Sequence, residues 1–447
     1  MRKNKWLYIK IMYLAIPVAL ENLVYSLINF IDIFMVGKEN IALGLGSVAI
    51  SSIGVSNQIF LIYSSCLFGI LSGANILAAQ YFGAKDFKTL RKIITITLFL
   101  GLAFSLPFII AGNIIPEKII SFYTSDPKVI SLSQKYFKII IYTFPLHAIG
   151  FSFAMLLRSI NMPKYSLYAS FSGLIINIGL NLILIPKIGV EGAAIATLVA
   201  RIVTVIYILF TITYKKIPIL PRISELKYIS LDFVQKIIKI STLTFMHELL
   251  WSVAYSTKVM LYGKVGITAF SSIQLVTSIS GLIFTLFIGL SNATAIIIGN
   301  EIGRGHMDRA YDYSKKCLKL FGIVAIMVSV CINIFAPIIL NNMGTSTQLY
   351  NVSISVIRAE SIVNILKSYS IIFLIGILRA GGDIGFSLVV ELAFMWLVGI
   401  PMTYFAILLK LPISIIYLIS WSDELFKLYP CIKRYISKKW ITNLIKE

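Results

Sequence analysis

Charged residues are scarce in this sequence. Only 13% of its 447 residues are Asp, Glu, Lys or Arg, whereas a soluble domain carries about 25%. Hydrophobic residues reach 58%, and the mean hydropathy is +0.89. This balance excludes a soluble protein and predicts an integral membrane protein. Because the basic, apolar N-terminus runs directly into a full-length span and lacks an A-x-A-like cleavage site, we expect it to be retained.

Cysteine and histidine are also rare. The four cysteines are scattered, without a CxxC pair or a neighbouring histidine, which argues against a disulfide framework and a metal centre. The sequence contains no HExxH, GxSxG or paired-acid motif, so nothing favours an enzyme, and we expect no cofactor. A channel is disfavoured as well, because no re-entrant, filter-like segment is recognisable.

Acidic residues are fewer than basic ones, and the net charge is +21. Such an excess can indicate nucleic-acid binding, but the basic residues lie in short loops between apolar runs, so we expect no nucleic-acid partner. Lys and Arg alternate between loops as the positive-inside rule requires. The basic segments are the N-terminus, 84–92, 158–164, 214–227, 304–319 and the C-terminal tail. We therefore expect a multi-pass protein of the cell membrane with both termini in the cytoplasm.

Hydropathy and turn signals predict twelve transmembrane helices, since a helix crosses a bilayer with about 20 mostly apolar residues. The predicted spans are 11–36, 48–79, 92–114, 131–157, 165–186, 189–213, 237–262, 266–298, 314–341, 352–378, 385–409 and 411–429. The last one is short, but without it the basic tail would lie outside the cell. The expected fold class is thus an all-α polytopic membrane protein.

The two halves of the chain contain similar segments in the same order. The matched segments are Ser51–Ile53 with Ser271–Ile273, Gly69 with Gly289, Gln80–Lys85 with Asn300–Gly305, and Leu157–Ser159 with Leu378–Ala380. We predict an N-terminal lobe at 1–213, a cytoplasmic connector at 214–236 and a C-terminal lobe at 237–447. Because each half has six spans, the lobes should be related by a pseudo-two-fold axis along the membrane normal. Two such lobes leave a cleft that opens to alternate sides when they rock.

The first span carries a polar stripe on one helix face. Its members, spaced i, i+3, i+7 and i+10, are Asn22, Tyr25, Asn29 and Asp32. When Gly37 is aligned with Gly263, the matching positions in the seventh span are Glu248, Trp251, Tyr255 and Lys258. The polar face is kept while its charges change. Since an ionisable residue is costly inside a membrane, such residues are candidate functional sites.

Several short motifs resemble the multidrug and toxic compound extrusion (MATE) family of secondary transporters. They are Pro17, Asp32 and Val36–Gly37 in the first span, Ala79–Ala84, Glu191–Thr197, Glu248–Trp251, Gly299–Gly303 and Leu378–Asp383. The resemblance covers nearly the whole chain. It implies twelve helices in two six-helix bundles around a cavity, and efflux of organic cations, drugs or dyes in exchange for Na+ or H+.

The resemblance also implies a cation site in the N-terminal lobe, formed by Asp32, Asn177, Asn181 and Thr197. The residues support it independently, because Asn177 and Asn181 share one helix face and hard cations prefer oxygen ligands. A proton can take the place of Na+ at Asp32. Two alternatives remain open. The Asn pair only links helices by hydrogen bonds, or Arg201, one turn after Thr197, pairs with Asp32 as a structural ion pair.

In the C-terminal lobe the resemblance implies a role for Glu248. Trp251, one turn away, offers an aromatic face for an organic cation; alternatively, Glu248 pairs with Lys258 or Lys367. Some family members carry a second acid on the tenth helix. This chain has Ser368 near that position, beside Lys367, so we expect the second acid to be missing. Further candidate substrate or coupling residues are Asn22, Tyr25, Tyr255, Gln58 and Gln274. The two glutamines either line the cleft or link helices by hydrogen bonds.

Other polar residues receive structural interpretations. Three are interpreted as topology and loop-fixing residues at cytoplasmic helix ends, namely Arg158, Arg379 and Asp383. Two histidines, His147 and His306, are interpreted as structural or solvent-exposed. Glu391 is expected to form an ion pair and has no assigned role.

The predicted function is that of a secondary active antiporter. It exports small, cationic organic substrates by alternating access, with Na+ or H+ bound at Asp32. The alternative is a lipid-linked precursor flippase of the same superfamily, for which Arg201, Lys258 and Lys367 provide a more cationic cleft. We expect a monomer that contacts membrane lipids and uses no cofactor beyond the coupling ion.

Overall fold

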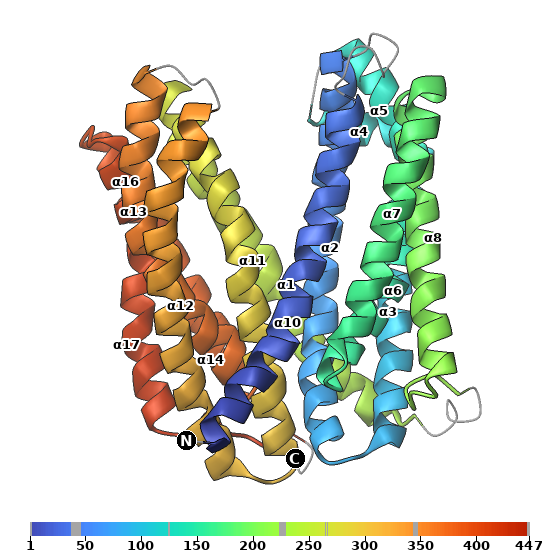
Figure 1. Cartoon of the computed structure of the whole chain (residues 1–447), viewed down its shortest axis with the longest axis vertical. Coiled ribbons are helices and arrows are strands. Elements are labelled where there is room, and N and C mark those ends of the chain that lie inside the picture. Colours follow the sequence, from blue (N-terminus) through green and yellow to red (C-terminus); the bar gives the residue numbers. More distant parts are fainter. Residues whose placement is uncertain are drawn as a thin grey trace. The chain divides into compact units, whose positions relative to one another are not determined.

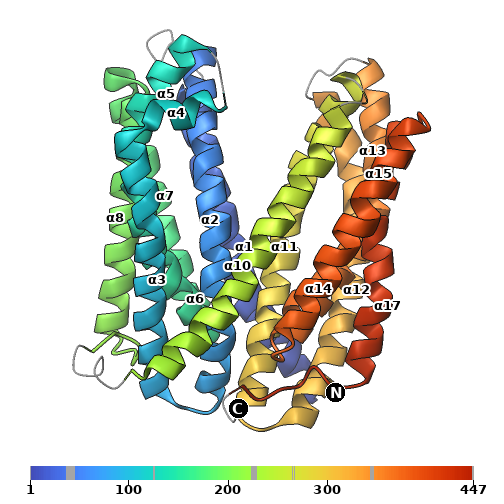
Figure 2. The same ribbon diagram turned by 180° about the vertical axis from the view of Figure 1, so that it is seen from behind.

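The chain folds into helices joined by turns (Figures 1 and 2). The computed structural model describes residues 2–36, 46–123, 126–222, 229–263, 265, 267–342 and 347–444. The helices of the first half are α1 (Arg2–Val36), α2 (Gly46–Gly83), α3 (Phe87–Ile114), α4 (Pro116–Ser121), α5 (Pro127–Ile140), α6 (Thr143–Ser159), α7 (Pro163–Ile188) and α8 (Val190–Tyr214). Those of the second half are α10 (Leu231–Gly263), α11 (Ile267–Gly303), α12 (Met307–Asn342), α13 (Thr347–Ile371), the π-helical η1 (Ile372–Arg379), α14 (Ile384–Phe394), the π-helical η2 (Met395–Gly399), α15 (Ile400–Leu408), α16 (Ile413–Ser420) and α17 (Ser422–Ile436).

Nine stretches of helix in the described part of the chain are long and apolar enough to cross a membrane. They are Tyr8–Tyr25, Ser52–Gly83, Phe87–Ile114, Pro163–Ile188, Val190–Tyr214, Phe284–Gly303, Met307–Ile338, Tyr350–Arg379 and Ile384–Leu408. A tenth span results if α5 and α6, which are bent by 47° at their junction, cross as a pair. The predicted fold class, an all-α polytopic membrane protein, is confirmed.

Two of the twelve predicted spans do not meet this criterion. The region 237–262 lies within α10, a single helix of 33 residues. At 1.5 Å per residue its length of about 50 Å suffices to cross a bilayer, but its charged residues lower its hydropathy. The span predicted over 411–429 is wrong as one continuous helix, because α16 ends at Ser420 and α17 begins at Ser422. Charged residues directly after this break explain why hydropathy gave only a short apolar run here.

Contacts within the chain define two compact units. Unit 1 comprises residues 1–19 and 246–447, and unit 2 comprises residues 20–245. Helices α1 and α10 are each divided at these boundaries, so their earlier and later parts belong to different units. The predicted lobes and the symmetry axis between them stay a prediction.

Glycines of α2 allow the first part of α10 to pack closely in unit 2. A Cβ atom added at Gly69 would lie 2.7 Å from Cα of Phe245, and one at Gly73 would lie 2.8 Å from Cα of Ser241. The hydroxyl of Thr244 donates a 2.5 Å hydrogen bond to the carbonyl oxygen of Gly69. Any larger residue at the two glycine positions would force the helices apart.

Helices α7 and α8 lie side by side in unit 2 (Figure 1). A Cβ atom added at Gly173 of α7 would overlap the hydroxyl of Thr204 on α8. Towards the other end of the pair, a Cβ atom at Gly192 would lie 2.6 Å from the carbonyl carbon of Leu184. Small residues let membrane helices approach closely, so the polar side chains of α7 between these contacts are held against α8.

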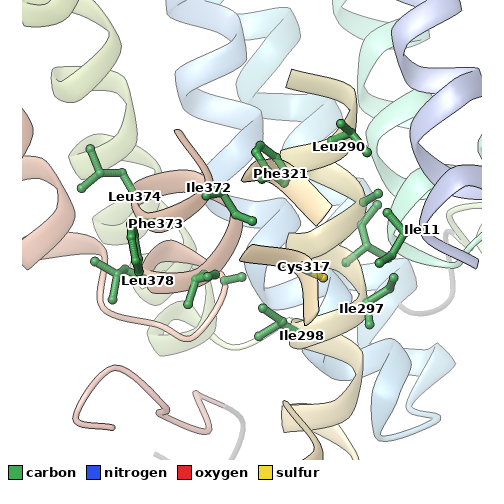
Figure 3. Packing of buried hydrophobic residues seen from close by; sticks show 14 of the residues in the cluster. Ile11, Leu290, Ile297, Ile298, Cys317, Phe321, Ile372, Phe373, Leu374 and Leu378 are labelled. Carbon is green, nitrogen blue, oxygen red and sulfur yellow. The ribbon is translucent and has the colours of Figure 1, made fainter. Parts of the chain in front are cut away.

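Unit 1 has an apolar core of its own, in which α11, α12 and η1 meet the beginning of α1 (Figure 3). Ile11 of α1, Ile297 of α11 and Phe321 of α12 are among its fully or almost fully buried members. A Cβ atom added at Gly289 of α11 would lie 2.8 Å from the carbonyl oxygen of Ala15. The start of α1 is therefore fixed in unit 1 by close helix packing, as the start of α10 is in unit 2.

Candidate functional site

Asp32 of α1 is the centre of a buried polar cluster in unit 2. The residue is 1% exposed. Its Oδ1 accepts hydrogen bonds from Nδ2 of Asn177 at 3.2 Å and from Nδ2 of Asn181 at 2.6 Å. Its Oδ2 accepts one from the hydroxyl of Thr197 at 2.7 Å. Helices α1, α7 and α8 thus bring together the four residues that the sequence assigned to a cation site.

The two asparagines also contact each other and Thr197. Nδ2 of Asn181 donates to Oδ1 of Asn177 at 3.2 Å, and Nδ2 of Asn177 donates to the hydroxyl of Thr197 at 3.1 Å. Oδ1 of Asn181 is buried and has no hydrogen-bond partner among the described residues. A buried acceptor without a donor costs free energy. This oxygen, next to a carboxylate, is therefore suited to face a cation or a proton.

Arg201 lies one turn beyond Thr197 on α8 but does not pair with Asp32. Its guanidinium lies over the ring of Tyr25, 4.9 Å from the centroid, and 5.7 Å from that of Phe60. In the described part of the chain no basic nitrogen lies within 4.0 Å of the Asp32 carboxylate. The structure thus does not contain the alternative ion pair between Arg201 and Asp32.

The hydrogen bonds described for the Asp32 carboxylate thus all come from neutral donors. Hydrogen bonds to a charged group contribute about 1.5–3 kcal/mol each, but none of these partners cancels the charge itself. Within the described ranges, no three His, Cys, Asp or Glu side chains are grouped so that they could hold a metal ion. The candidate ligands are one carboxylate, two amides and one hydroxyl. Only the carboxylate is charged, so one monovalent cation would neutralise the site.

A second buried polar cluster, in unit 1, surrounds His247 of α10. Nε2 of His247 lies 2.5 Å from Oε2 of Glu391 on α14, and Nδ1 lies 3.2 Å from Oε1 of Glu248. Arg379 of η1 places Nη2 at 2.8 Å from Nδ1 of the ring and Nη1 at 3.4 Å from Oε1 of Glu248. The basic partner of Glu248 is therefore Arg379, and the predicted alternatives Lys258 and Lys367 are wrong.

Lys258 and Lys367 have acidic partners of their own. Nζ of Lys258 lies 2.9 Å from Oδ1 of Asp423, whose Oδ2 lies 2.8 Å from Nζ of Lys427. Lys367 pairs with Glu360 at 3.3 Å. Both Lys258 and Lys367 also face the ring of Trp421, at 4.5 and 3.6 Å from its centroid. Their charges are thus balanced inside the unit.

Comparison with known proteins decides the family. The MatE family profile matches residues 17–183 and 244–405 of this chain. The chain belongs to the MatE family. The family predicted from the sequence motifs is thereby confirmed, and because its members are transporters, the chain is a multi-pass membrane transporter.

Relatives of this MatE-family chain match it over nearly their whole length. The probable multidrug resistance protein YoeA of Bacillus subtilis is 22% identical, over 96% of this chain and 94% of its own length. A crystal structure of MATE in the bent conformation has a TM-score of 0.84, with 18% identity and 96% coverage of both chains. The outward-facing structure of a MATE multidrug resistance transporter also has a TM-score of 0.84, with 19% identity and the same coverage. The structural matches establish the MATE fold.

A buried ion pair in this MatE-family chain joins α1 to α6. Nη2 of Arg158 lies 3.0 Å from Oε2 of Glu21, and both residues are almost fully buried. Ser166 of α7 donates a 2.7 Å hydrogen bond to the same carboxylate oxygen. The loop-fixing interpretation of Arg158 and Arg379 is therefore wrong, because their partners lie inside the units. Glu21 was not predicted, although an acid in an apolar run was a signal for it.

Glu360 is a second acid that sequence analysis did not single out. It lies on α13, the tenth predicted span, eight residues before Ser368, and is 1% exposed. Besides Lys367, the hydroxyl of Tyr417 contacts it, donating a 2.8 Å hydrogen bond. The tenth span therefore carries an acid after all, but this acid is already neutralised by a lysine.

The remaining candidate substrate or coupling residues lie in both units. In unit 2, Asn22 and Tyr25 are half-buried, and Gln58 is exposed. The side chains of Asn29 and Gln274 lie outside the described residues. In unit 1, the rings of Trp251 and Tyr255 stack in parallel with centroids 5.5 Å apart. The structure thus gathers the ion-site residues, whereas the proposed substrate residues are divided between the two units.

The structure shows the contacts of three residues that the sequence analysis interpreted as structural. His147 is buried among aromatic rings, 5.3 Å from the ring of Phe151. His306 is partly exposed and lies 3.2 Å from Glu301. Asp383 precedes α14 and pairs with Arg434 of α17 at 2.5 Å, so it does fix one turn. The hydrogen bond to Asp383 raises the pKa of the Arg434 guanidinium.

Proposed function

We propose that this MatE-family transporter is a cation-coupled antiporter that exports small organic cations, including drugs and dyes. The single observation that supports it best is the Asp32 cluster. A carboxylate away from water has three neutral donors and no basic partner within 4.0 Å in the described part of the chain. Buried charges require a counter-charge. A Na+ ion or a proton from outside supplies it.

The two coupling ions make different demands on this cluster. A proton on Asp32 needs only an acceptor, and the unpartnered Oδ1 of Asn181 provides one once the amide, which now directs Nδ2 towards Asp32, has turned. A Na+ ion needs several oxygen ligands, so at least one amide that now directs Nδ2 towards Asp32 must turn its oxygen inward. In both cases the hydrogen bonds between α1 and α7 are rearranged.

This rearrangement provides the coupling in the proposed cycle. An ion entering from outside neutralises Asp32 and favours one packing of α1, α7 and α8. That packing binds the organic substrate less tightly, and the substrate is released outward. Such coupling operates only if the ion and the substrate prefer different conformations of the protein. In this proposal the basic loops place both termini in the cytoplasm, and the protein acts as a monomer in the cell membrane.

Ethidium transport in vesicles that contain the purified protein tests the proposal. A Na+ gradient is imposed first without a proton gradient, and a proton gradient is then imposed without Na+. We expect ethidium to move against one of the two ion gradients and to stop when that gradient is collapsed by an ionophore. Ethidium movement that persists unchanged without either gradient would contradict the antiport.

A lipid-linked precursor flippase is the second candidate function. Lys258 and Lys367, which face Trp421 together, are the observation that favours it, because an anionic lipid headgroup needs basic partners. Their pairing with Asp423 and Glu360 weakens this argument. Dye accumulation in whole cells separates the two, because expression of a flippase leaves it unchanged, whereas expression of a drug exporter lowers it.

A further inference from the structure

The His247 cluster of unit 1 contains charged groups from three helical segments. Glu248 lies on the same helix as His247, Arg379 is the last residue of η1, and Glu391 lies on α14. Beyond Glu391, α17 contributes Lys427, whose Nζ is held by Asp423 at 2.8 Å and Glu424 at 3.1 Å. The charges that face the imidazole directly are therefore two carboxylates and one guanidinium.

The imidazole has hydrogen-bond partners in both of its protonation states. Nε2 faces a carboxylate oxygen of Glu391 at 2.5 Å, to which it donates in either state, and it also lies 3.1 Å from Nη2 of Arg379. Nδ1 faces two groups of opposite character, the donor Nη2 of Arg379 at 2.8 Å and the acceptor Oε1 of Glu248 at 3.2 Å. A neutral ring accepts from Arg379, and a protonated ring donates to Glu248. Adding or removing the proton leaves neither nitrogen without a partner.

The net charge of this group changes with that proton. With His247 neutral, two carboxylates and one guanidinium sum to −1; with His247 protonated, the sum is zero. An uncompensated buried charge is unfavourable. When the proton leaves, another positive charge is therefore favoured next to Glu248 and Glu391.

The two carboxylates of this cluster are partly exposed. The side chains of Glu248 and Glu391 keep 16% and 13% of their surface exposed, although His247 keeps only 4%. Trp251 and Tyr255 lie three and seven residues after Glu248, on the same side of α10, and their stacked rings offer an aromatic face. Aromatic faces next to a carboxylate are favourable for an organic cation.

We propose that His247 is a proton-binding site of unit 1, and that its proton is exchanged for the positive charge of the transported organic cation. In the exchange an N–H bond of the imidazolium breaks, its electron pair stays on the ring nitrogen, and the proton passes to water. Nδ1 then accepts a hydrogen bond from Arg379, and the cation restores the zero charge of the group. This inference rests on the proposed export of cations, but not on the role of Asp32.

Proton release on binding of tetraphenylphosphonium (TPP+) tests the exchange. The full chain is purified in detergent with a pH-indicating dye, in an Asp32→Asn background that removes any contribution of the unit 2 site. We expect release of about one proton for each TPP+ bound, and an affinity that rises with pH by at most about tenfold per unit. The added change His247→Gln abolishes the release while TPP+ still binds.

His306→Gln is the matched control, because it removes another histidine that contacts a glutamate, Glu301, away from this cluster. It should leave the release unchanged. Nitrogen-15 NMR of the three histidines gives a second readout that does not depend on a variant. On addition of TPP+, the signal assigned to His247 should change from imidazolium to neutral imidazole.

Several outcomes overturn the exchange. These are release that survives His247→Gln, binding of TPP+ without release, absence of TPP+ binding to the Asp32→Asn protein, or a His247 signal that TPP+ does not change. Failure of the proposed antiport looks different, because gradient-driven ethidium efflux would then be absent while TPP+ still displaced the proton.

Discussion

Asp32 of unit 2 and three acids of unit 1 are stabilised in opposite ways. In unit 2, Asp32 is surrounded by two amides and a hydroxyl, none of which carries a charge. In unit 1, Glu248, Glu360 and Asp423 each lie within 4.0 Å of a basic nitrogen of the same unit. An acid whose nearest partners are neutral donors lacks a counter-charge in contact with it. An acid with a basic partner within 4.0 Å already has a counter-charge in its own unit.

Replacing the acid of unit 2 should cause the largest functional loss. Asp32→Asn removes the charge that attracts the coupling ion but keeps the shape of the side chain, so gradient-driven ethidium efflux should fall to background. Protein yield and thermal stability should remain close to wild type, because no basic residue is left without its partner. Efflux, protein yield and thermal stability are measured on the same vesicle preparation.

Asp312→Asn is the control for this change, since Asp312 pairs with Lys316 at the surface and is 58% exposed. It should leave efflux unchanged. Wild-type drug resistance in cells that express the Asp32→Asn protein would refute a coupling role for this residue.

The same chemical change in unit 1 should act on stability instead. Asp423→Asn leaves Lys258 and Lys427 with one counter-charge fewer in the interior, and loss of one partner of a buried ion pair costs about 3–5 kcal/mol. The buried thiols of Cys66, Cys317 and Cys431 provide the measurement, because a thiol-reactive dye labels them on unfolding. Labelling should begin at a lower temperature than in wild type.

A second substitution checks the cause of this loss. In the double variant Asp423→Asn, Lys258→Met, one unpaired charge is removed and part of the stability should return. A double variant that is less stable than Asp423→Asn alone would show that charge balance is not the reason.

The amide donors of unit 2 should have graded effects. Asn181 bonds to Asp32 at 2.6 Å and Asn177 at 3.2 Å, so Asn181→Ala should be the more harmful change. A hydrogen bond to a charged group contributes about 1.5–3 kcal/mol, so the loss of one should change the affinity of Asp32 for the coupling ion by about tenfold or more. The ion concentration for half-maximal ethidium efflux gives the value for each variant. Equal effects of both substitutions would mean that the two amides do not hold the ion through Asp32.

The smallest effect is expected at the ion pair outside the spans. Arg434→Gln breaks the contact with Asp383, which is partly solvent-exposed, and such pairs contribute about 0–1 kcal/mol. Because the hydrogen bond raises the pKa of Arg434, its contribution is fully present below the unfolded-state value and is lost only in strong alkali. The difference in thermal stability should thus be equal at pH 6 and pH 9 and shrink in high salt. A difference that varies between these two pH values would contradict this assignment.

The resemblance to MATE transporters implied the Asp32 site, and local spacing supported it. An acid in an apolar run and two asparagines four residues apart are local features, and the four residues do meet in the structure. The partners of Glu21 and Glu360 depend instead on which helices touch, and spacing carries no information about that. The transmembrane spans show the same difference between local and non-local features. The predicted span 189–213 corresponds to α8. The predicted last span missed the break at Trp421, because hydropathy does not register a turn between two short helices.

The close contact of Gly69 and Gly73 with residues 241–245 bears on how the protein can be dissected. A fragment that stops at the connector between α8 and α10 would expose the backbone of α2 at those glycines, since no side chain there can cover it. A fragment that retains this contact must therefore extend to residue 245. Two gene segments divided inside the connector should yield transporter only when they are synthesised together in one cell.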